Sequence, residues 1–360
     1  MVLTKPSFSL FPQLWLKRST LFSLDQSYIF DVTSSANSSH FAVSASNHQI
    51  KTYDREKLSI LNTLQFHRDN VTEIKYKQEN ILVSSSKDGS VAVWDLRNNN
   101  GPAQVFKASK NEALLSFDFN SDDTALAAGT ELDDDAKILF WDVRANNCVT
   151  EFFESHNDDI TQVRFHPNDP KRLTSGAVDG LICTYDISIN EDDALLAVAN
   201  TGSSVSKIGF FGPSFEYIYC LNHMETFSLW NHEGETLANF GDTRQAVEQQ
   251  FPMNYAIDCH YDSATQRLYL LGGTIDGDMG IFHVNSDSLQ LCDVLSGGHT
   301  DIVRSVYWDI TSGTMISGGE DAKLCYWDPS GNNAMNSLSA KQSPSVAKVT
   351  AGSSRFNPYK

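Results

Sequence analysis

The sequence lacks the features of an exported, membrane-spanning or nucleic-acid-binding protein. No apolar run approaches the ~20 residues that a membrane-spanning helix needs. Pro6 and Pro12 interrupt the N-terminal stretch that would be apolar in a signal peptide. Bases are scarce, since 27 Lys and Arg stand against 45 Asp and Glu and give a net charge of −18. Because phosphate backbones and anionic membranes repel such a chain, we expect protein partners, with no direct nucleic acid and no membrane.

Common catalytic and metal-binding motifs are also missing. The six cysteines lie far apart without a Cys-x-x-Cys pair, which favours reduced thiols in the nucleus or the cytoplasm over disulfides or zinc ligands. The sequence contains no phosphate-binding GxxxxGK[ST] loop, no HExxH motif and no GxSxG motif. We therefore expect no enzymatic activity, no metal and no cofactor.

The sequence does contain a repeat. Short β-rich runs end in an aromatic residue followed by aspartate, and two degenerate pairs complete the series. The seven pairs are Tyr53-Asp54, Trp94-Asp95, Trp141-Asp142, Tyr185-Asp186, Trp230-Asn231, Phe282-His283 and Trp327-Asp328. Their spacing averages about 46 residues, close to the ~40–45 residues of a four-stranded propeller blade. No helical periodicity is sustained, so the pattern predicts an all-β chain of seven such units.

Three of the units also carry a histidine, a serine and a turn aspartate at matching positions. The histidine stands 27 to 29 residues before the aromatic residue, and the serine stands four residues before the aspartate. The three sets are His67, Ser84, Asp88 and Trp94; His156, Ser175, Asp179 and Tyr185; and His299, Ser317, Asp321 and Trp327.

With these residues the sequence resembles the WD40 repeat family over roughly residues 20–328. The resemblance implies a seven-bladed WD40 β-propeller in which His, Ser, Asp and Trp or Tyr form a hydrogen-bonded tetrad within a blade. Buried polar groups of this kind must satisfy one another. A hydrolase triad of Ser, His and Asp is the alternative interpretation, but threefold recurrence at the repeat spacing favours a structural device.

The other four units depart from this pattern. Asn47 stands where the first unit should have its aspartate, and the third unit has Asp135 and Trp141 but no histidine. The fifth unit has no turn aspartate, and the sixth keeps Asp276 without the tryptophan. We expect these blades to be the least rigid.

Closure of the ring is predicted to use the N-terminus. The chain after Asp328 is rich in serine and offers no good outer strand for the last blade, whereas residues 19–24 do. A strand from the opposite end of the chain removes an exposed edge and locks the ring. The predicted organisation is an N-terminal extension (1–16), a propeller closed by an N-terminal strand (17–328) and a disordered, basic, Ser-rich tail (329–360) with four bases and no acids.

Three segments are more particular than a generic WD40 repeat. They are Gly129–Ala136, Ser155–Pro167 and Asn190–Leu195, and in this order they look like the small family of WD repeat-containing protein 89. That family brings little established biochemistry, so the resemblance sharpens the expected fold more than the function.

The WD40 resemblance also implies where the loops lie, because in such propellers the loops before the first strand and between the second and third strands share one face. On that face we expect a set of acids: Asp69, Glu131, Asp133, Asp134, Asp158, Asp159 and Asp301. A negative platform of this kind attracts a basic peptide or protein. The alternative is that an acidic protein has acidic loops everywhere, and Glu191, Asp192 and Asp193, expected on the opposite face, favour it.

Two consecutive units carry a WDxR motif, which ends in Arg97 and in Arg144. An aspartate stands nine residues before each arginine, namely Asp88 and Asp135. The arrangement resembles the box through which WD40 substrate receptors dock on the adaptor of cullin-4 ubiquitin ligases, which implies a docking site away from the acidic loops. The alternative is that each arginine pairs with the nearby aspartate and docks nothing.

Together these observations predict a non-catalytic scaffold or adaptor that mediates protein–protein interactions. A basic client on the acidic loop face is the leading hypothesis, and a substrate receptor of a cullin-4 ubiquitin ligase is the alternative. We expect an intracellular, soluble protein of the nucleus or the cytoplasm, present as a monomer within a larger complex.

Overall fold

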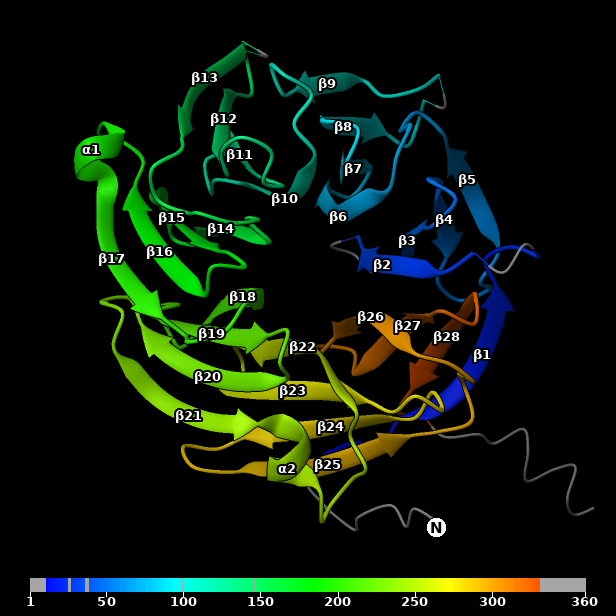
Figure 1. The fold of residues 1–360 in the computed structure, drawn as a ribbon. Helices are drawn as coiled ribbons and strands as arrows, with labels where there is room; N and C mark the ends of the chain where they lie inside the picture. The colour runs from blue at the N-terminus through cyan, green and yellow to red at the C-terminus, as the bar shows by residue number, and fades with distance from the viewer. Residues whose placement is uncertain (1–10, 25–26, 36–38, 99, 146, 331–360) are drawn as a thin grey trace, which may run out of the picture.

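The repeat of the sequence corresponds to seven four-stranded antiparallel sheets arranged in a ring (Figure 1). The structure is a computed structural model, and it describes residues 11–24, 27–35, 39–98, 100–145 and 147–330. The prediction of a seven-bladed all-β propeller is therefore confirmed. Residues 331–360, most of the predicted tail, lie outside the described residues.

We number the blades along the chain and give their strands from the central channel outward. Blade 1 has β2 (Ile29–Ser34), β3 (His40–Ala45), β4 (Ile50–Asp54) and β5 (Ile60–Leu64); blade 2 has β6 (Val71–Gln78), β7 (Ile81–Ser86), β8 (Ser90–Asp95) and β9 (Gln104–Lys107). Blade 3 has β10 (Leu114–Phe119), β11 (Ala125–Thr130), β12 (Ile138–Asp142) and β13 (Asn147–Phe152); blade 4 has β14 (Gln162–His166), β15 (Asp169–Gly176), β16 (Leu181–Asp186) and β17 (Leu195–Asn200).

Blade 5 has β18 (Val205–Phe211), β19 (Tyr217–Asn222), β20 (Thr226–Asn231) and β21 (Thr236–Asp242); blade 6 has β22 (Tyr255–Asp262), β23 (Arg267–Gly273), β24 (Met279–Val284) and β25 (Leu289–Leu295). Blade 7 has β26 (Val303–Asp309), β27 (Thr314–Gly319), β28 (Lys323–Asp328) and, outermost, β1 (Trp15–Leu21). The helices of the described chain, α1 (Glu191–Ala194) and α2 (Thr243–Val247), are far shorter than an apolar helix that crosses a bilayer.

The hydrophobic core lies in layers between neighbouring blades. Side chains of a strand alternate between its two faces, so in β12 Ile138 and Phe140 pack toward blade 4, while Leu139 and Trp141 pack toward blade 2. The aromatic residue of each strong repeat packs on the preceding blade in this way, as Trp327 does on blade 6. This alternation explains why the repeat shows a short β-rich run before every aromatic residue.

Strand β1 closes the ring from the opposite end of the chain, as predicted, but its position differs from the prediction. It runs antiparallel to β28, with Trp15 opposite Asp328 and Leu21 opposite Lys323. The strand therefore begins four residues before the predicted Ser19. Two anchors set this register: the Leu14 N–H donates to the buried Asp293 carboxylate of β25 (2.7 Å), and the Phe22 N–H donates to the Ala322 carbonyl (2.8 Å).

Because consecutive strands are antiparallel, the connections of the blades alternate between two faces. We call the loop face the one that carries the connections from the outer strand of a blade to the inner strand of the next, together with those between the second and third strands. Figure 1 looks onto this face, and α2, which lies in the connection from blade 5 to blade 6, is in front.

Candidate functional site

The structure brings together each of the three sets of histidine, serine, aspartate and aromatic residue. In blade 2 the His67 ring lies between the Ser84 hydroxyl (Nε2–Oγ 2.8 Å) and the Asp88 carboxylate (Nδ1–Oδ2 3.1 Å), and the Trp94 indole donates to Ser84 (2.9 Å). Blades 4 and 7 repeat the arrangement with His156, Ser175, Asp179 and Tyr185, and with His299, Ser317, Asp321 and Trp327.

Burial and hydrogen bonding show that the three tetrads have a structural role. Ser84, Ser175 and Ser317 are 0% exposed, so no substrate reaches their hydroxyls. Each aspartate also accepts two backbone N–H groups, one from the loop after the histidine and one from the third strand. For Asp321 these donors are Thr300 (2.9 Å) and Lys323 (3.1 Å). The carboxylate thus ties a loop of the loop face to the blade beneath it.

For Asp88, Asp321 and His156, hydrogen bonds and nearby charges outweigh the effect of burial on the pKa. Burial by itself raises the pKa of Asp88 and Asp321, but the bonds from His67 and His299 and from the nearby donors hold both pKa values well below the usual range. Burial by itself lowers the pKa of His156, yet the bond to Asp179, followed by the Cys183 thiol, raises it to about 9. This folded-state pKa exceeds the unfolded value of ~6.5. Protonation of His156 therefore stabilises the fold, and the stabilisation is complete below pH ~6.5.

We expect this contribution to be lost as the pH rises through about 9. The urea midpoint of the wild-type protein should therefore fall between pH 6 and pH 9.5 by more than that of His156→Asn, which cannot be protonated in this range. The measurement is a pair of urea melts at each pH. Parallel changes in the two proteins would show that His156 does not change its charge in this window.

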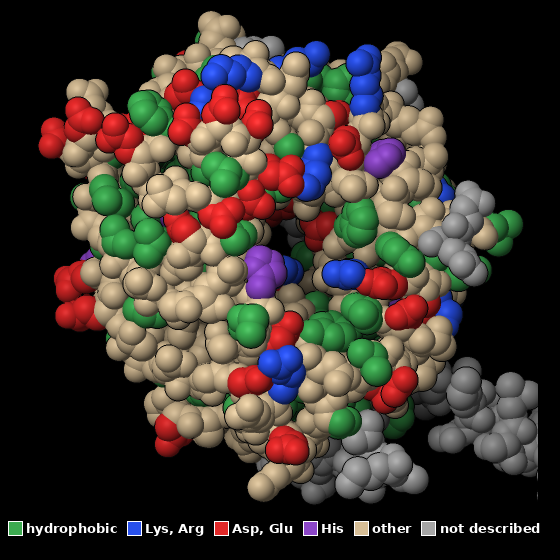
Figure 2. Space-filling view, viewed as in Figure 1, with side chains coloured by type: hydrophobic (Ala, Val, Ile, Leu, Met, Phe, Trp, Pro, Cys, Tyr) green, Lys and Arg blue, Asp and Glu red, His purple; other side chains and the backbone are tan. Residues whose placement is uncertain are grey.

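All seven acids expected on the loop face lie in its connections. Asp69, Asp158, Asp159 and Asp301 follow outer strands, and Glu131, Asp133 and Asp134 connect β11 to β12. The loops of blades 3 and 4 touch, because the Leu132 N–H donates to the Asp159 carboxylate (2.7 Å) and the Ile160 N–H donates to the Thr130 carbonyl (3.0 Å). Figure 2 shows acidic side chains gathered where blades 3 and 4 border the central opening.

Ion pairs leave this charge unevenly distributed over the loop face. Lys87 neutralises Glu131 (2.7 Å), Arg244 neutralises Asp242 (2.7 Å) and Arg304 binds Glu320 (Nε–Oε1 2.6 Å). Among the described residues no basic side chain pairs with Asp133, Asp134, Asp158 or Asp159. Nor do three or more His, Cys, Asp or Glu of the described chain form a group able to hold a metal ion. Asp69 and Asp301 also lack a basic partner among the described residues, but they lie in the loops before blades 2 and 7, whereas the four aspartates are grouped in two touching loops.

Two acidic residues have surroundings other than those expected. Asp135, expected at the turn position of blade 3, is exposed, and the Thr130 hydroxyl accepts the Lys137 N–H (2.8 Å) in its turn instead. Glu191 lies in the connection from β16 to β17, which belongs to the opposite face as expected, but its side chain reaches the neighbouring blade. Its carboxylate accepts the backbone N–H groups of Phe153 (2.5 Å) and Glu154 (2.9 Å), so α1 lies at the rim beside the end of β13 (Figure 1).

The two WDxR arginines lie in connections between third and outer strands, on the face opposite the loop face, but they differ in their bonds. The Arg97 guanidinium holds both oxygens of Asp95 (2.8 and 2.7 Å). Arg144 is exposed, and its bond to Asp142 is made by the backbone N–H (2.8 Å). Asp88, nine residues before Arg97, is held in the blade 2 tetrad. The two motifs therefore do not present the same side-chain geometry.

A ring of charged residues in the central channel was missed by the sequence analysis. The inner strands surround a cavity of 390 Å³. Along the inner strands Asp31 accepts the Ile74 N–H of the next blade (3.0 Å), Glu73 accepts the Phe117 N–H (3.0 Å), and Asp118 accepts the Phe165 N–H (2.8 Å). Each acid thus joins the inner strand of its own blade to that of the next. An acid in the first strand of successive repeats is the sequence signal that points to this role.

Bases complete the channel network. Arg164 binds Glu73 (2.9 Å), Lys75 binds Glu73 (3.2 Å) and Asp118 (3.1 Å), and Lys207 binds Asp258 (2.9 Å). Burial alone raises the pKa of Glu73, but Arg164 and Lys75 lower it below the ordinary value. The ion pairs and hydrogen bonds offset the desolvation cost of burying these charges in the channel wall.

Comparison with known proteins places this fold in a family. The model of the WD domain, G-beta repeat, matches residues 58–95, 146–186 and 290–328, which contain the third strands of the three blades with complete tetrads. The WD repeat-containing protein 89 homolog of Dictyostelium discoideum is 33% identical over 93% of this chain and 92% of its own length.

Two further WD repeat-containing proteins are similar to this chain over most of its length. The WD repeat-containing protein GTS1 of Arabidopsis thaliana is 34% identical over 87% of this chain and 84% of its own length. An uncharacterized WD repeat-containing protein of Saccharomyces cerevisiae is 30% identical over 69% of this chain and 64% of its own length. With the propeller, the tetrads and these whole-chain similarities in agreement, the chain belongs to the WD40 repeat family and, within it, to the family of WD repeat-containing protein 89.

Proposed function

We propose that this protein is a non-catalytic scaffold that holds a basic segment of a client protein against the loops of blades 3 and 4. The observation that carries the proposal is the group of four aspartates, Asp133, Asp134, Asp158 and Asp159, in two touching loops, with no basic partner among the described residues. The relatives that align over most of the chain are named for their WD repeats and not for an enzymatic activity.

Charge and geometry both support a basic client. Exposed acids of one sign on one face raise the local concentration of a cationic partner and orient it before contact. The loop of blade 3 is held to that of blade 4 by the bond from Leu132 to Asp159, so the acids are presented by a fixed backbone. The exposed Leu132 side chain lies next to Asp133 and offers an apolar contact within the charged area.

Replacing Asp133 and Asp134 by Asn is expected to weaken binding of a lysine-rich peptide about three- to tenfold at low salt, because exposed ion pairs contribute modestly. The loss should shrink as salt is raised, since screening acts over ~8 Å at physiological ionic strength. Fluorescence anisotropy of a labelled peptide measures both effects.

The matched control makes the same charge change away from the loop face. Asp122, between β10 and β11, and Asp287, between β24 and β25, are exposed and lie in connections of the opposite face. Asp122→Asn with Asp287→Asn should leave peptide binding near the wild-type value. An equal loss in both double variants would show that the peptide responds to net charge and has no site in the loops of blades 3 and 4.

The alternative hypothesis, docking on the adaptor of a cullin-4 ligase, has less support. Arg97 is engaged with Asp95, so the hypothesis rests on Arg144, which is exposed. Docking through the WDxR motifs stays a prediction, and the acidic loops carry the function that we propose.

A further inference from the structure

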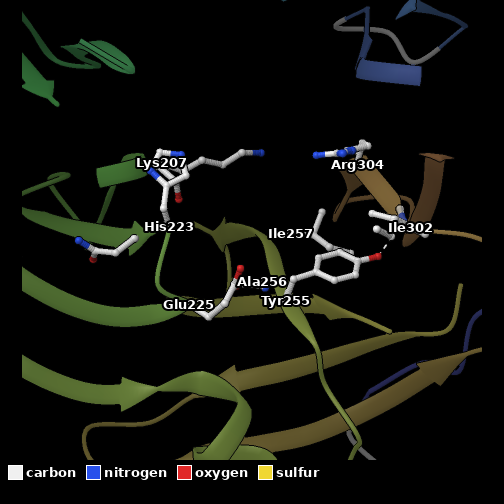
Figure 3. A pocket seen from close by; sticks show the side chains of 11 residues that line it. Lys207, His223, Glu225, Tyr255, Ala256, Ile257, Ile302 and Arg304 are labelled. Carbon is white, nitrogen blue, oxygen red and sulfur yellow. Dashed lines mark hydrogen bonds between the residues drawn. The ribbon is translucent and has the colours of Figure 1, made fainter. Parts of the chain in front are cut away.

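A cavity of 440 Å³ opens on the loop face where blades 5, 6 and 7 meet (Figure 3). Lys207 of β18 and Arg304 of β26 enter it from opposite sides and point toward one another across it. Ile257 of β22 lies between them, and His223 and Glu225, from the loop between β19 and β20, complete one wall. Lys207 and Arg304 also line the channel cavity described above, whereas Asp133, Asp134, Asp158 and Asp159 line neither cavity.

Each of the two cations is held by one carboxylate and keeps further donors. Lys207 Nζ lies 2.9 Å from Asp258 Oδ2, and Arg304 binds Glu320 through Nε (2.6 Å) and Nη2. An ammonium has three N–H donors and a guanidinium has five. Within the described part of the chain, the hydrogen bonds of these two side chains go to those acids. The remaining donors are available to an acceptor between the two side chains.

The walls of the cavity are cross-linked and therefore formed before any ligand arrives. The Val303 N–H of blade 7 donates to the Tyr255 hydroxyl of blade 6 (2.7 Å), and the Ala256 N–H donates to the Glu225 carboxylate of blade 5 (2.6 Å). Ile257 is buried and presents an apolar floor. A preformed, partly apolar cavity with a few convergent polar groups is the usual form of a ligand site.

Two facing cations beside an apolar floor define the chemistry of the ligand. A carboxylate accepts hydrogen bonds from both cations at once, and charge-assisted bonds of this kind are the strong ones. The apolar floor calls for an apolar group close to that carboxylate. The C-terminal residue of a polypeptide carries both groups on one Cα atom, whereas the carboxylate of an internal Asp or Glu side chain brings no second apolar side chain with it.

We propose that this cavity binds the C-terminal residue of a partner protein, with its α-carboxylate between Lys207 and Arg304 and its apolar side chain on Ile257. Capture of a terminal carboxylate is a known mode of peptide recognition. A partner bound here is oriented on the loop face by its chain end, independently of any basic segment on blades 3 and 4.

The test uses three labelled peptides: one that ends in leucine with a free carboxylate, its C-terminal amide, and one that ends in glycine with a free carboxylate. We expect the leucine acid to bind, and the amide to bind about tenfold more weakly because the charge-assisted bonds are lost. The glycine peptide should also bind more weakly, since it lacks the apolar contact. Equal binding of the acid and the amide would overturn the proposal.

Arg304→Gln is the decisive variant, because the Arg304 side chain is 52% exposed and its loss does not disturb the core. It should weaken the leucine acid about tenfold and leave the amide unchanged, while Arg304→Lys should restore part of the loss. Arg244→Gln is the matched control: Arg244 also lies on the loop face, binds Asp242 as Arg304 binds Glu320, and does not line the cavity. An equal loss in Arg304→Gln and Arg244→Gln would refute a specific site.

Two further peptides test the assignment to a chain end. An amidated peptide with an internal aspartate should bind as weakly as the leucine amide, and tighter binding would replace the terminal carboxylate by a side-chain one. A peptide of residues 331–360, added as competitor, should not displace the leucine acid; displacement would make this segment of the same chain the ligand. Asp133→Asn with Asp134→Asn should bind the leucine acid normally, so this proposal and the basic-client proposal fail separately.

Discussion

Deleting residues 1–26 is expected to unfold or aggregate the protein. The deletion removes all of β1, and with it the strand that pairs with β28 from Trp15–Asp328 to Leu21–Lys323. Blade 7 would then end in β28, a strand that carries the buried Trp327 and Cys325, with an open hydrogen-bonding edge. An open apolar edge invites pairing with other chains.

The deletion also removes contacts to two neighbouring blades. Leu14 is buried in the cluster of blades 6 and 7 and bonds to Asp293, which is itself 0% exposed. Phe22 is buried in the cluster of blades 7 and 1, where the Lys51 ammonium donates to its carbonyl (2.6 Å). One N-terminal segment therefore holds three blades together, so its loss affects the whole ring rather than one sheet.

Circular dichroism and size-exclusion chromatography measure the outcome, and deletion of residues 333–360 is the control of similar length. That control removes residues outside the described structure and should leave the melting midpoint nearly unchanged. A milder variant, Phe22→Ala, keeps the chain length and is expected to cost about 3–5 kcal/mol, as for other buried phenylalanines. A stable protein without residues 1–26 would mean that some other segment closes blade 7.

The sequence reveals the blades because their determinants are local. Each blade repeats an aromatic residue that packs on the preceding blade, and three blades repeat the polar residues that bond to one another, so spacing alone identifies them. The register of β1 was less visible, because it depends on the bond between Leu14 and Asp293, 279 residues apart in the sequence. The adjacent polar residues Lys17 and Arg18 also interrupt the apolar–polar alternation that would mark the start of the strand.

Of the two candidate sites, the acidic loops could be predicted from the sequence and the cavity between Lys207 and Arg304 could not. The acidic loops could be assigned to one face through the WD40 resemblance, which implies that these connections share a face. The facing of Lys207 and Arg304 could not be predicted, since these residues come from blades 5 and 7 and meet only because the ring curves. The bonds of Glu191 to the next blade could not be predicted for a related reason: the outer strands lie along the rim, so a connection of the opposite face reaches the end of β13.

Substitutions in the tetrads are expected to have the second large effect. Asp88→Ala, Asp179→Ala and Asp321→Ala should each lower the free energy of unfolding by about 1–3 kcal/mol, because each leaves buried partners unpaired. Each substitution leaves without an acceptor one imidazole and two backbone N–H groups, which for Asp179 belong to His156, Asn157 and Leu181. Urea melts measure the change, and substitutions in different blades should add because they share no partner.

Asp135→Ala is the sharpest control for this expectation, because Asp135 occupies the corresponding turn of blade 3 but is exposed and has no hydrogen-bond partner within the described residues. It should change stability by no more than about 0.5 kcal/mol, as other surface substitutions do, and so should Asp193→Ala. Glu191 is unsuitable as a control, since it accepts the N–H groups of Phe153 and Glu154. If Asp135→Ala destabilised the protein as much as Asp88→Ala, the turn position itself would matter, and the bonds to histidine would not explain the effect.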